Sequence, residues 1–320
     1  MPSVARRVGW RLRDWGRGLW ITRRVRLLWW TRRMAANDGV CSIEIATDII
    51  GFFAQIDWCL HICRYCEGHG LIPDIRLTAD IYLDRRRGPN WLDYYFDWTS
   101  PIAEETARRV RYTRKITHLE ELGLPAAPMT LEEGARVLRK YLRPKPHITA
   151  LVEDFWRSHD VAGEVIGIHF RGTDKSFEAP RVSWQHCLAV LLAHLRRDPA
   201  LRAVFIASDE QAFIDFMKAS VQEVPVYCHA DHYRSVDGKP VHFAPGNGYQ
   251  KGEDAFVNAL LLSKCATVIR TTSFLSAWAS IFNPDLKVVL LNRPRANRLW
   301  FPESEILKRR DTEYVPETPL

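Results

Sequence analysis

The sequence predicts an α/β protein built on parallel sheets, and two patterns carry this prediction. In the second half, short apolar runs rich in β-branched residues alternate with helical stretches, and the runs end in polar residues. In the first half, an apolar run, a glycine turn, a helix and a second run follow one another as a βαβ unit. Apolar strands that alternate with helices are typical of parallel sheets covered on both faces.

The first 37 residues form a basic arm that precedes this α/β body. Residues 1–36 hold ten arginines and one aspartate, a charge of +9, whereas the whole chain carries +7 and the remainder therefore −2. Tryptophans and leucines recur at helical spacing between the arginines, which is typical of a helix at an anionic membrane surface. Docking on the body, a disordered arm and nucleic-acid binding are the alternatives. The body gives no reason from charge to expect nucleic acid as a partner.

The apolar runs and the cysteines set expectations for location. Arginines interrupt every apolar run near the N-terminus, and no stretch reaches the roughly 18 apolar residues of a membrane span. We therefore expect a cytoplasmic protein, peripheral at the membrane face if the arm binds lipid. The seven cysteines are expected to be free thiols in a reducing compartment.

The expected N-terminal domain covers residues 38–150. Its βαβ unit comprises a strand at 41–47, a helix at 52–68 after a turn ending at Gly51, and a strand at 71–77. Cys59, Cys63 and Cys66 lie on that helix, but the second cysteine pair of a structural zinc site is missing, so buried thiols are favoured over a metal site.

Two further features complete this domain. The aromatic cluster from Trp91 to Trp98 predicts either a core segment or a platform for a sugar ring. Helical patterns at 130–142 and 148–158 follow, separated by Pro144 and Pro146. These prolines place the domain boundary near residue 150.

The expected C-terminal domain covers residues 151–303, followed by a tail at 304–320. Its predicted strands are 164–170, 203–207, 224–228, 265–270 and 286–291, and its predicted helices are 182–197, 210–220, 253–263 and 273–282. The long polar loop from His229 to Gly252 contains Asp231, His232 and His242, but their spacing matches no zinc template, and we expect no metal.

Polar groups at the ends of these strands predict the functional site. His169 and Arg171 end the first strand, Asp209 and Glu210 follow the second, and Arg270 to Ser273 follow the fourth. Because the carboxyl ends of parallel strands meet at one edge, we expect them to face a common ligand. The planar fork of Arg171 suits a phosphate. The hydroxyls of residues 271–273 at a helix start suit an anion or an ordinary N-cap.

Three blocks of the second half resemble a known family. The blocks are Gly167–Lys175, Val204–Glu210 and Glu253–Ser273. They resemble the fucosyltransferase group that includes the rhizobial nodulation fucosyltransferase and the eukaryotic α1,6-fucosyltransferases. The resemblance implies a GT-B-like fold of two Rossmann-like domains and inverting transfer of fucose from GDP-fucose to a glycan hydroxyl, without metal or another cofactor. The acceptor would be an oligosaccharide or a lipid-linked glycan.

The resemblance also implies roles for single residues. Arg171 would bind the β-phosphate, Asp254 would contact guanine and Ser273 would lie near the phosphates. The other expected substrate-binding residues are His169, Gly172, Asp209, Arg270 and Thr272, and the acids expected to serve in catalysis beside Arg171 are Asp174 and Glu178, with Asp209 as a rival base.

One position departs from the family, and two other functions stay open. Gly172 stands where eukaryotic members carry a second basic residue, so either the phosphate clamp is weaker here or Arg270 or Lys175 assists Arg171. A glycosyltransferase that uses another nucleotide sugar is one alternative. A non-catalytic protein that binds a nucleotide sugar or a membrane is the other.

Overall fold

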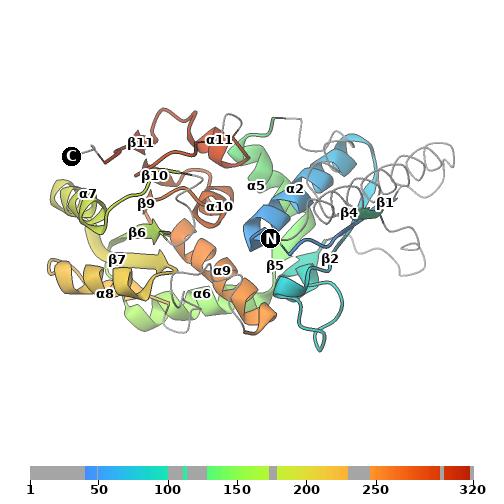
Figure 1. The fold of residues 1–320 in the computed structure, drawn as a ribbon, viewed down its shortest axis with the longest axis horizontal. Helices are drawn as coiled ribbons and strands as arrows, with labels where there is room; N and C mark the ends of the chain where they lie inside the picture. Colours follow the sequence, from blue (N-terminus) through green and yellow to red (C-terminus); the bar gives the residue numbers. More distant parts are fainter. Residues whose placement is uncertain are drawn as a thin grey trace, which may run out of the picture.

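The computed structural model describes residues 40–48, 50–99, 111–113, 128–172, 179–229, 246–295 and 299–317 of the chain. They form two parallel sheets that stand beside each other with helices between and around them (Figure 1). The predicted α/β class with parallel sheets is confirmed. The predicted basic arm lies outside the described residues, as does the loop part that contains Asp231, His232 and His242.

The N-terminal sheet contains the predicted βαβ unit. β1 (Val40–Ile45) lies between β2 (Ile72–Leu77) and β4 (Arg111–Thr113), and both neighbours run parallel to it. α2 (Phe52–Gly68) connects β1 to β2, as predicted. A helix that is apolar on all sides must be buried on all sides, and α2 packs against β2, α5 (Leu131–Tyr141) and α10 (Phe274–Phe282).

The three cysteines of α2 are buried as free thiols. Burial raises the pKa of Cys59 and of Cys63 well above the ordinary value, so both stay protonated. Within the described residues, no group of three or more His, Cys, Asp or Glu side chains could hold a metal ion.

The aromatic cluster after β2 is core and not a sugar platform. It forms η1 (Asp80–Tyr82), the short helix α3 (Leu92–Tyr95) and β3 (Phe96–Trp98), which pairs antiparallel with β5 (Leu142–Pro144). Trp91, Tyr95 and Phe96 are at most 1% exposed. The rings of Trp91 and Tyr95 pack against Phe52, each with its centroid 5.2 Å away, and the Phe96 ring packs against Phe256 at 4.6 Å.

The C-terminal sheet has six parallel strands in the order β11-β10-β9-β6-β7-β8. Its strands and helices follow the predicted alternation, and their bounds are β6 Glu164–Phe170, α7 Trp184–Arg197, β7 Leu201–Ser208, α8 Gln211–Ser220, β8 Val226–Cys228, α9 Gly248–Ser263, β9 Thr267–Arg270, α10, β10 Lys287–Leu290, α11 Glu303–Ile306 and β11 Glu313–Tyr314. The first strand in sequence, β6, is therefore central, flanked by β7 on one side and β9 on the other. The connections diverge between β6 and β9, which is where doubly wound sheets bind ligands.

The domain limits differ from the prediction at two places. α6 (Pro146–His159) runs through residue 150 without a break. Beyond residue 303, β11 pairs in parallel with β10, so the segment predicted as a tail adds the edge strand of the sheet. A two-residue strand leaves no alternating pattern in the sequence, which is why it was not predicted.

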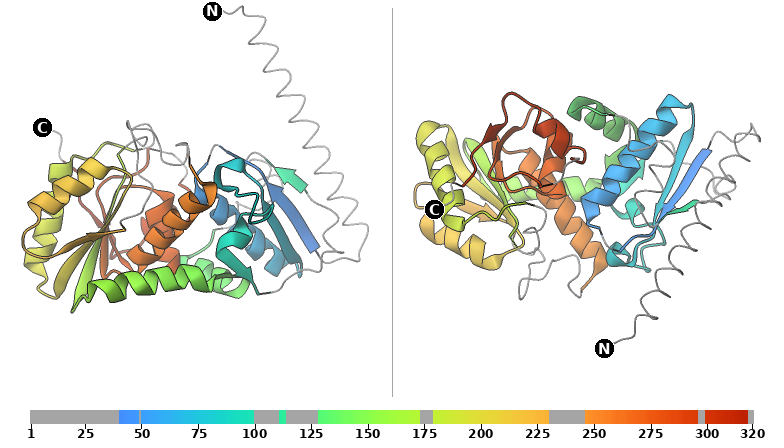
Figure 2. Two further views of the ribbon diagram at one scale, coloured as in Figure 1. Left: turned by 90° about the horizontal axis from the view of Figure 1, so that it is seen from below. Right: turned by 45° about the horizontal axis from the view of Figure 1, so that its top comes forward.

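α9 begins five residues earlier than predicted and passes between the two sheets (Figure 2). Asn247 starts it by accepting a hydrogen bond from the Tyr249 backbone N–H at 3.0 Å. A Cβ on Gly252 would lie 2.2 Å from Tyr95 Oη, so only glycine permits this approach. The Tyr95 hydroxyl donates to the Tyr249 carbonyl at 2.7 Å, and the two rings stack. The start of α9 therefore packs into the N-terminal part of the molecule.

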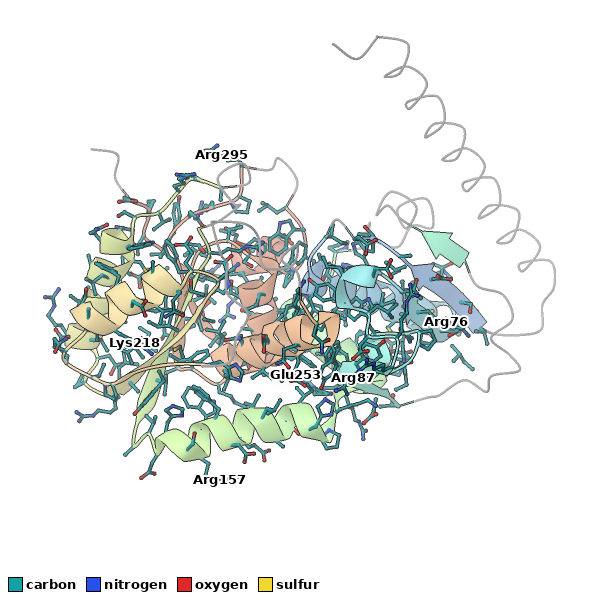
Figure 3. The ribbon with its side chains drawn as sticks, turned by 60° about the horizontal axis from the view of Figure 1, so that its bottom comes forward. Arg76, Arg87, Arg157, Lys218, Glu253 and Arg295 are labelled. Atoms are coloured by element: carbon teal, nitrogen blue, oxygen red, sulfur yellow. The ribbon has the colours of Figure 1, made fainter. Side chains whose placement is uncertain are left out.

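The same junction carries charged groups. Arg87 lies over the Tyr249 ring, with its Cζ 3.6 Å from the centroid, and the Tyr249 hydroxyl donates to Glu253. Figure 3 labels Arg87 and Glu253 close to each other. Among the described helices, none is both long enough and apolar enough to cross a membrane.

Candidate active site

The ends of β6 and β9 bring two of the predicted segments together. His169 on β6 is paired with Arg270 on β9, and the chain leaves the two strands toward opposite sides. Just beyond them, the Arg171 backbone N–H donates to Thr271 Oγ1 at 3.0 Å. Arg171 is thus fixed beside the start of α10, at the position expected for a ligand of this sheet.

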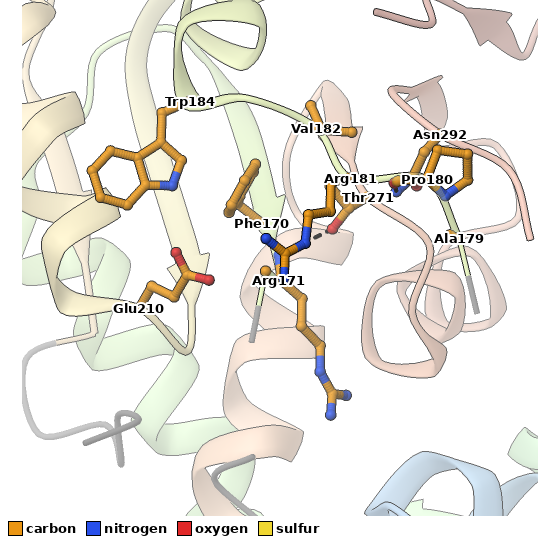
Figure 4. Close-up of a pocket in the computed structure, with 11 residues that line it drawn as sticks. Phe170, Arg171, Ala179, Pro180, Arg181, Val182, Trp184, Glu210, Thr271 and Asn292 are labelled. Carbon is orange, nitrogen blue, oxygen red and sulfur yellow. Dashed lines mark hydrogen bonds between the residues drawn. The ribbon is translucent and has the colours of Figure 1, made fainter. Parts of the chain in front are cut away.

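The side chain of Arg171 lies beside the carboxyl group of Asp209 and points toward the N-terminal sheet. Its Nε lies 3.7 Å from Asp209 Oδ2, at the end of β7. Figure 4 shows the guanidinium pointing away from Glu210 and Trp184. Burial raises the pKa of Tyr82 in η1, and the positive charge of Arg171 is among the effects that oppose this rise. The charge of Arg171 therefore acts in the space between the two sheets.

His169 and Asp254 are both buried near this edge. His169 is 4% exposed and follows Val165 and Gly167 on the face of β6 that α9 covers. Asp254 is 1% exposed in the second turn of α9. It accepts a hydrogen bond from Gln250 Nε2 at 3.0 Å, and its carbonyl accepts one from Asn258 Nδ2 at 2.7 Å. A carboxylate with a fixed orientation can accept two parallel N–H donors from a planar base.

Arg270 has a structural role and does not assist Arg171, which corrects the prediction. Its side chain is fully buried and pairs with the equally buried Glu303, Nη2 to Oε2 at 2.7 Å. The same guanidinium donates to Ser276 Oγ at 2.8 Å and to the Ser273 carbonyl at 2.9 Å. These contacts hold the turn from β9 into α10, while Nη1 of Arg270 has no hydrogen-bond partner within the described part of the chain.

Thr272 and Ser273 lie in that turn. The Thr272 backbone N–H donates to Asn292 Oδ1 at 2.8 Å, and its hydroxyl donates to Glu303 at 3.2 Å. Thr272 thus supports the turn. Ser273 is the N-cap of α10, but its side chain makes no capping bond. Its buried Oγ has no hydrogen-bond partner within the described part of the chain. The N–H groups at a helix start and this hydroxyl suit an anion.

Glu210 was expected at this edge of the sheet but was not assigned a role in binding or catalysis. A Cβ on Gly172 would lie 2.1 Å from Glu210 Oε1, so the glycine leaves room for this carboxyl group. Burial and the neighbouring Asp209 raise the pKa of Glu210, while hydrogen bonds from the Trp184 side chain and the Gly172 backbone N–H oppose the rise. Successive side chains of a strand point to opposite faces of the sheet. The sequence therefore already indicates that Asp209 and Glu210 lie on opposite faces.

Glu210 borders a pocket of about 220 Å³ beside the end of β6 (Figure 4). Arg171 contributes to its wall, together with Trp184, Arg181, Thr271 and Asn292. The other two acids expected to act in catalysis, Asp174 and Glu178, lie outside the described residues, as does Lys175.

Comparisons with known proteins agree with this fold. No protein-family model matches the chain. The chain is 28% identical over 174 residues to nodulation protein Z of Bradyrhizobium diazoefficiens, a match that covers 51% of this chain. It spans about half the length of that relative, 46%.

Two solved structures have a fold similar to that of this chain. The crystal structure of the NodZ α1,6-fucosyltransferase soaked with GDP-fucose matches with a TM-score of 0.55 and 17% identity, over 80% of this chain and 99% of that one. The same enzyme co-crystallized with GDP matches with a TM-score of 0.50 and 17% identity, over 77% of this chain and 93% of that one. The resemblance to the NodZ-type fucosyltransferases and the GT-B-like fold are thereby confirmed.

Proposed function

We propose that this protein is an inverting glycosyltransferase that transfers fucose from GDP-fucose to a hydroxyl group of a glycan. The observation that carries the proposal is the position of Arg171, fixed beside the start of α10 at the switch point of the sheet. The similarity to nodulation protein Z and the shared fold with a fucosyltransferase soaked with GDP-fucose support the choice of donor.

In the proposed reaction, the bond between the fucose anomeric carbon and the β-phosphate oxygen breaks, and its electron pair leaves with GDP. The acceptor oxygen forms the new bond from the opposite face and gives up its proton. The departing diphosphate gains negative charge, which a fixed cation in a site shielded from water stabilises strongly. Arg171 cannot lose its proton and presents a planar fork, so it suits this role.

The remaining predicted residues take supporting roles in this proposal. The Ser273 hydroxyl and the first N–H groups of α10 would bind the phosphates. Asp254 would accept N1–H and N2–H of guanine, which selects guanine over adenine. Asp209 would hold Arg171 through Nε, the contact seen at 3.7 Å. Asp174 and Glu178 are the candidates that we propose for the general base, the carboxylate that accepts the proton of the acceptor hydroxyl.

Two variants of Arg171 test the proposal. Arg171→Ala should abolish fucose transfer and weaken GDP binding, and Arg171→Lys should also be severely impaired because a point charge replaces a bidentate fork. Turnover of GDP-fucose with a glycan extract and calorimetric titration with GDP measure the two effects. Full activity of Arg171→Ala would refute the assigned role.

The donor is tested separately by thermal shift. GDP at 100 times its dissociation constant should stabilise the protein by about 2.7 kcal/mol. UDP, ADP and CDP at the same concentration should give smaller shifts if guanine is recognised. A larger shift with UDP or ADP would point to a glycosyltransferase with another donor.

A further inference from the structure

A short segment, residues 180–184, forms part of the wall of the candidate active site. Its Trp184 lines the same pocket as Arg171 and Thr271 (Figure 4). The segment leads directly into α7, whose N-cap is Ser183. The contacts that fix this segment therefore also fix the wall beside Arg171.

Asn292, just beyond β10, holds the first residue of the segment. Asn292 is 6% exposed, and its Nδ2 donates to the Pro180 carbonyl at 2.8 Å. Its Oδ1 accepts a hydrogen bond from the Thr272 backbone N–H, also at 2.8 Å. One buried amide thus joins the segment to the turn that leads into α10.

Glu317, just beyond β11, holds the segment at Ser183. The Ser183 backbone N–H donates to Glu317 Oε2 at 2.8 Å, and the Ser183 hydroxyl donates to Oε1. The same hydroxyl caps α7 by accepting the His186 backbone N–H at 3.1 Å. The hydrogen bonds from Ser183 lower the pKa of Glu317, so this acid is ionised at neutral pH. A carboxylate that accepts two donors from one residue fixes the orientation of that residue.

The main chain around β11 brings Glu317 to this place. The Val315 backbone N–H donates to the Leu290 carbonyl at 2.9 Å, so the pairing with β10 continues beyond β11. The Val315 carbonyl accepts a hydrogen bond from His186 Nε2, in the first turn of α7, at 2.8 Å. The segment that was predicted as a tail is therefore tied to the start of α7 by its main chain and by a side chain.

A short series of contacts leads from the N-cap of α7 to Arg171. The indole of Trp184, the first residue of the helix, donates to Glu210. The same carboxyl group accepts the Gly172 backbone N–H. Gly172 directly follows Arg171, whose own backbone N–H is held by the turn after β9. The main chain at Arg171 is thus fixed from two sides, and Glu210 supplies one of them.

We propose that Glu317 is a positioning residue for the binding of the donor β-phosphate. It fixes Ser183, and through it the Trp184 indole that holds Glu210. The inference rests on the proposed function, in which Arg171 binds the β-phosphate of GDP-fucose. Glu317 acts at a distance, because it is not among the described residues that line the pocket.

The region of β11 offers a matched control at the opposite end of α7. Glu313 Oε2 lies 3.6 Å from His194 Nε2 and 3.5 Å from Arg197 Nη2, both in the last turn of the helix. A helix of 14 residues spans about 20 Å. Loss of either acid should loosen α7 from the sheet edge, whereas only the loss of Glu317 should reach the donor site.

Calorimetric titration of the full chain with GDP and with GMP tests the proposal. GMP lacks the β-phosphate that is assigned to Arg171. Glu317→Ala removes both acceptor oxygens, whereas Glu317→Gln keeps the shape of the side chain and one acceptor oxygen. Glu313→Ala is the control, and the Tm of each variant is measured alongside.

Glu317→Ala should weaken GDP binding by about tenfold, a loss of ~1.4 kcal/mol, and GMP binding by less than about twofold. Glu317→Gln should lie between the wild type and Glu317→Ala. Glu313→Ala should lower the Tm but keep both affinities within about twofold of the wild type. Unchanged GDP affinity in Glu317→Ala, equal losses for GDP and GMP, or the same loss in Glu313→Ala would each overturn the proposal.

A double variant tests the route through the indole. Trp184→Phe keeps an aromatic ring but removes the N–H that holds Glu210. It should weaken GDP binding about as much as Glu317→Ala, and the two changes together should cost little more than either alone, because both interrupt the same series of contacts. Fully additive losses would refute this route.

Failure of the proposed function gives a different result. If the wild-type protein binds neither GDP nor GDP-fucose, the proposed function is wrong and the role of Glu317 in donor binding is wrong with it. If the wild type turns over GDP-fucose and Glu317→Ala binds GDP equally well, the positioning role alone is wrong.

Discussion

Arg171 and Arg270 lie on adjacent strand ends, yet their surroundings give them opposite roles. Arg270 is fully buried and its charge is balanced by Glu303, so it stabilises the turn into α10. Arg171 is partly exposed beside Asp209 and remains close to open space. Sequence alone could not separate them, because both follow an apolar strand and the partner of Arg270 is 33 residues away.

Removing Arg270 should destabilise the protein and not merely weaken nucleotide binding. Arg270→Ala leaves the Glu303 carboxylate buried without its partner, which costs about 3–5 kcal/mol of unfolding free energy. Chemical denaturation followed by circular dichroism measures this. The double variant Arg270→Met with Glu303→Met should recover most of the loss, because both charges are then gone. A stable Arg270→Ala protein with reduced GDP affinity would contradict the structural role.

The position of a candidate site residue in the fold could be predicted where it depends on neighbours in sequence. The segment with His169 and Arg171 could be placed at the end of a buried strand, because the β-branched residues Val165, Ile166 and Ile168 precede the polar ones. Glu210 and Asn292 could not be assigned to a pocket, because their common wall is formed by segments about 80 residues apart. Only the fold shows that Gly172 leaves room for the Glu210 carboxyl group.

At the scale of elements, α9 is the part that the sequence defined least well. The glycines at 248 and 252 lower the helix propensity, so the first turn and a half of α9 was not predicted. Tertiary packing requires glycine at these positions, because a Cβ on Gly248 would lie 2.7 Å from the Tyr82 backbone. The other helices and strands that were predicted agree with the structure within a few residues, because amphipathic period and strand–turn alternation are local patterns. The short elements β3, β4, β5, β11, α3 and α11 were not predicted.

A methyl group on α9 should disturb the junction with the N-terminal part. Gly252→Ala would bring Cβ to 2.2 Å from Tyr95 Oη and 2.6 Å from Tyr95 Cζ, and overpacking of this kind costs ~1–3 kcal/mol. Differential scanning calorimetry should show a lower Tm. Adding Tyr95→Phe removes the clashing oxygen and should restore part of the loss.

Gly68→Ala serves as the control for that experiment. Nothing lies within 4 Å of a Cβ at the end of α2, so alanine should be neutral there or slightly stabilising. An unchanged Tm in Gly252→Ala would mean that α9 does not pack tightly against Tyr95.

At the scale of the whole molecule, one hydrophobic core joins the two sheets. It includes Ile43 of the N-terminal sheet, Phe53 of α2, and Phe205 and Val288 of the C-terminal sheet. Asp57 and His61 are buried in the same core, with Oδ2 and Nε2 at 3.7 Å. Burial raises the pKa of Asp57 well above its usual range and lowers that of His61 to about 4, so His61 is neutral at pH 7.

His61 should make the stability of the whole protein sensitive to acid. Its folded pKa of about 4 lies below the ordinary 6.5. Between these values only the unfolded chain binds the proton, so its stabilising contribution is full above pH 6.5 and is lost as pH falls toward 4. The loss reaches ~3 kcal/mol of unfolding free energy. Urea titrations at several pH values measure it.

Two histidine variants separate this effect from general acid denaturation. His61→Gln removes the titrating group and should flatten the slope between pH 6.5 and 4. His69→Gln, at the exposed end of the same helix, should keep the wild-type slope. Equal slopes in all three proteins would exclude His61 as the source.

The shared helix α9 has a consequence for engineering. Its first turns are built into the aromatic cluster around Tyr95, and its later part packs on β6 and β7. A chimera that exchanges domains at residue 150 would therefore join a foreign aromatic cluster to Gly248 and Gly252. Functional recombination requires two further crossover points, so that the start of α9 travels with the N-terminal sheet, although Tyr249 lies 154 residues beyond Tyr95 in the chain.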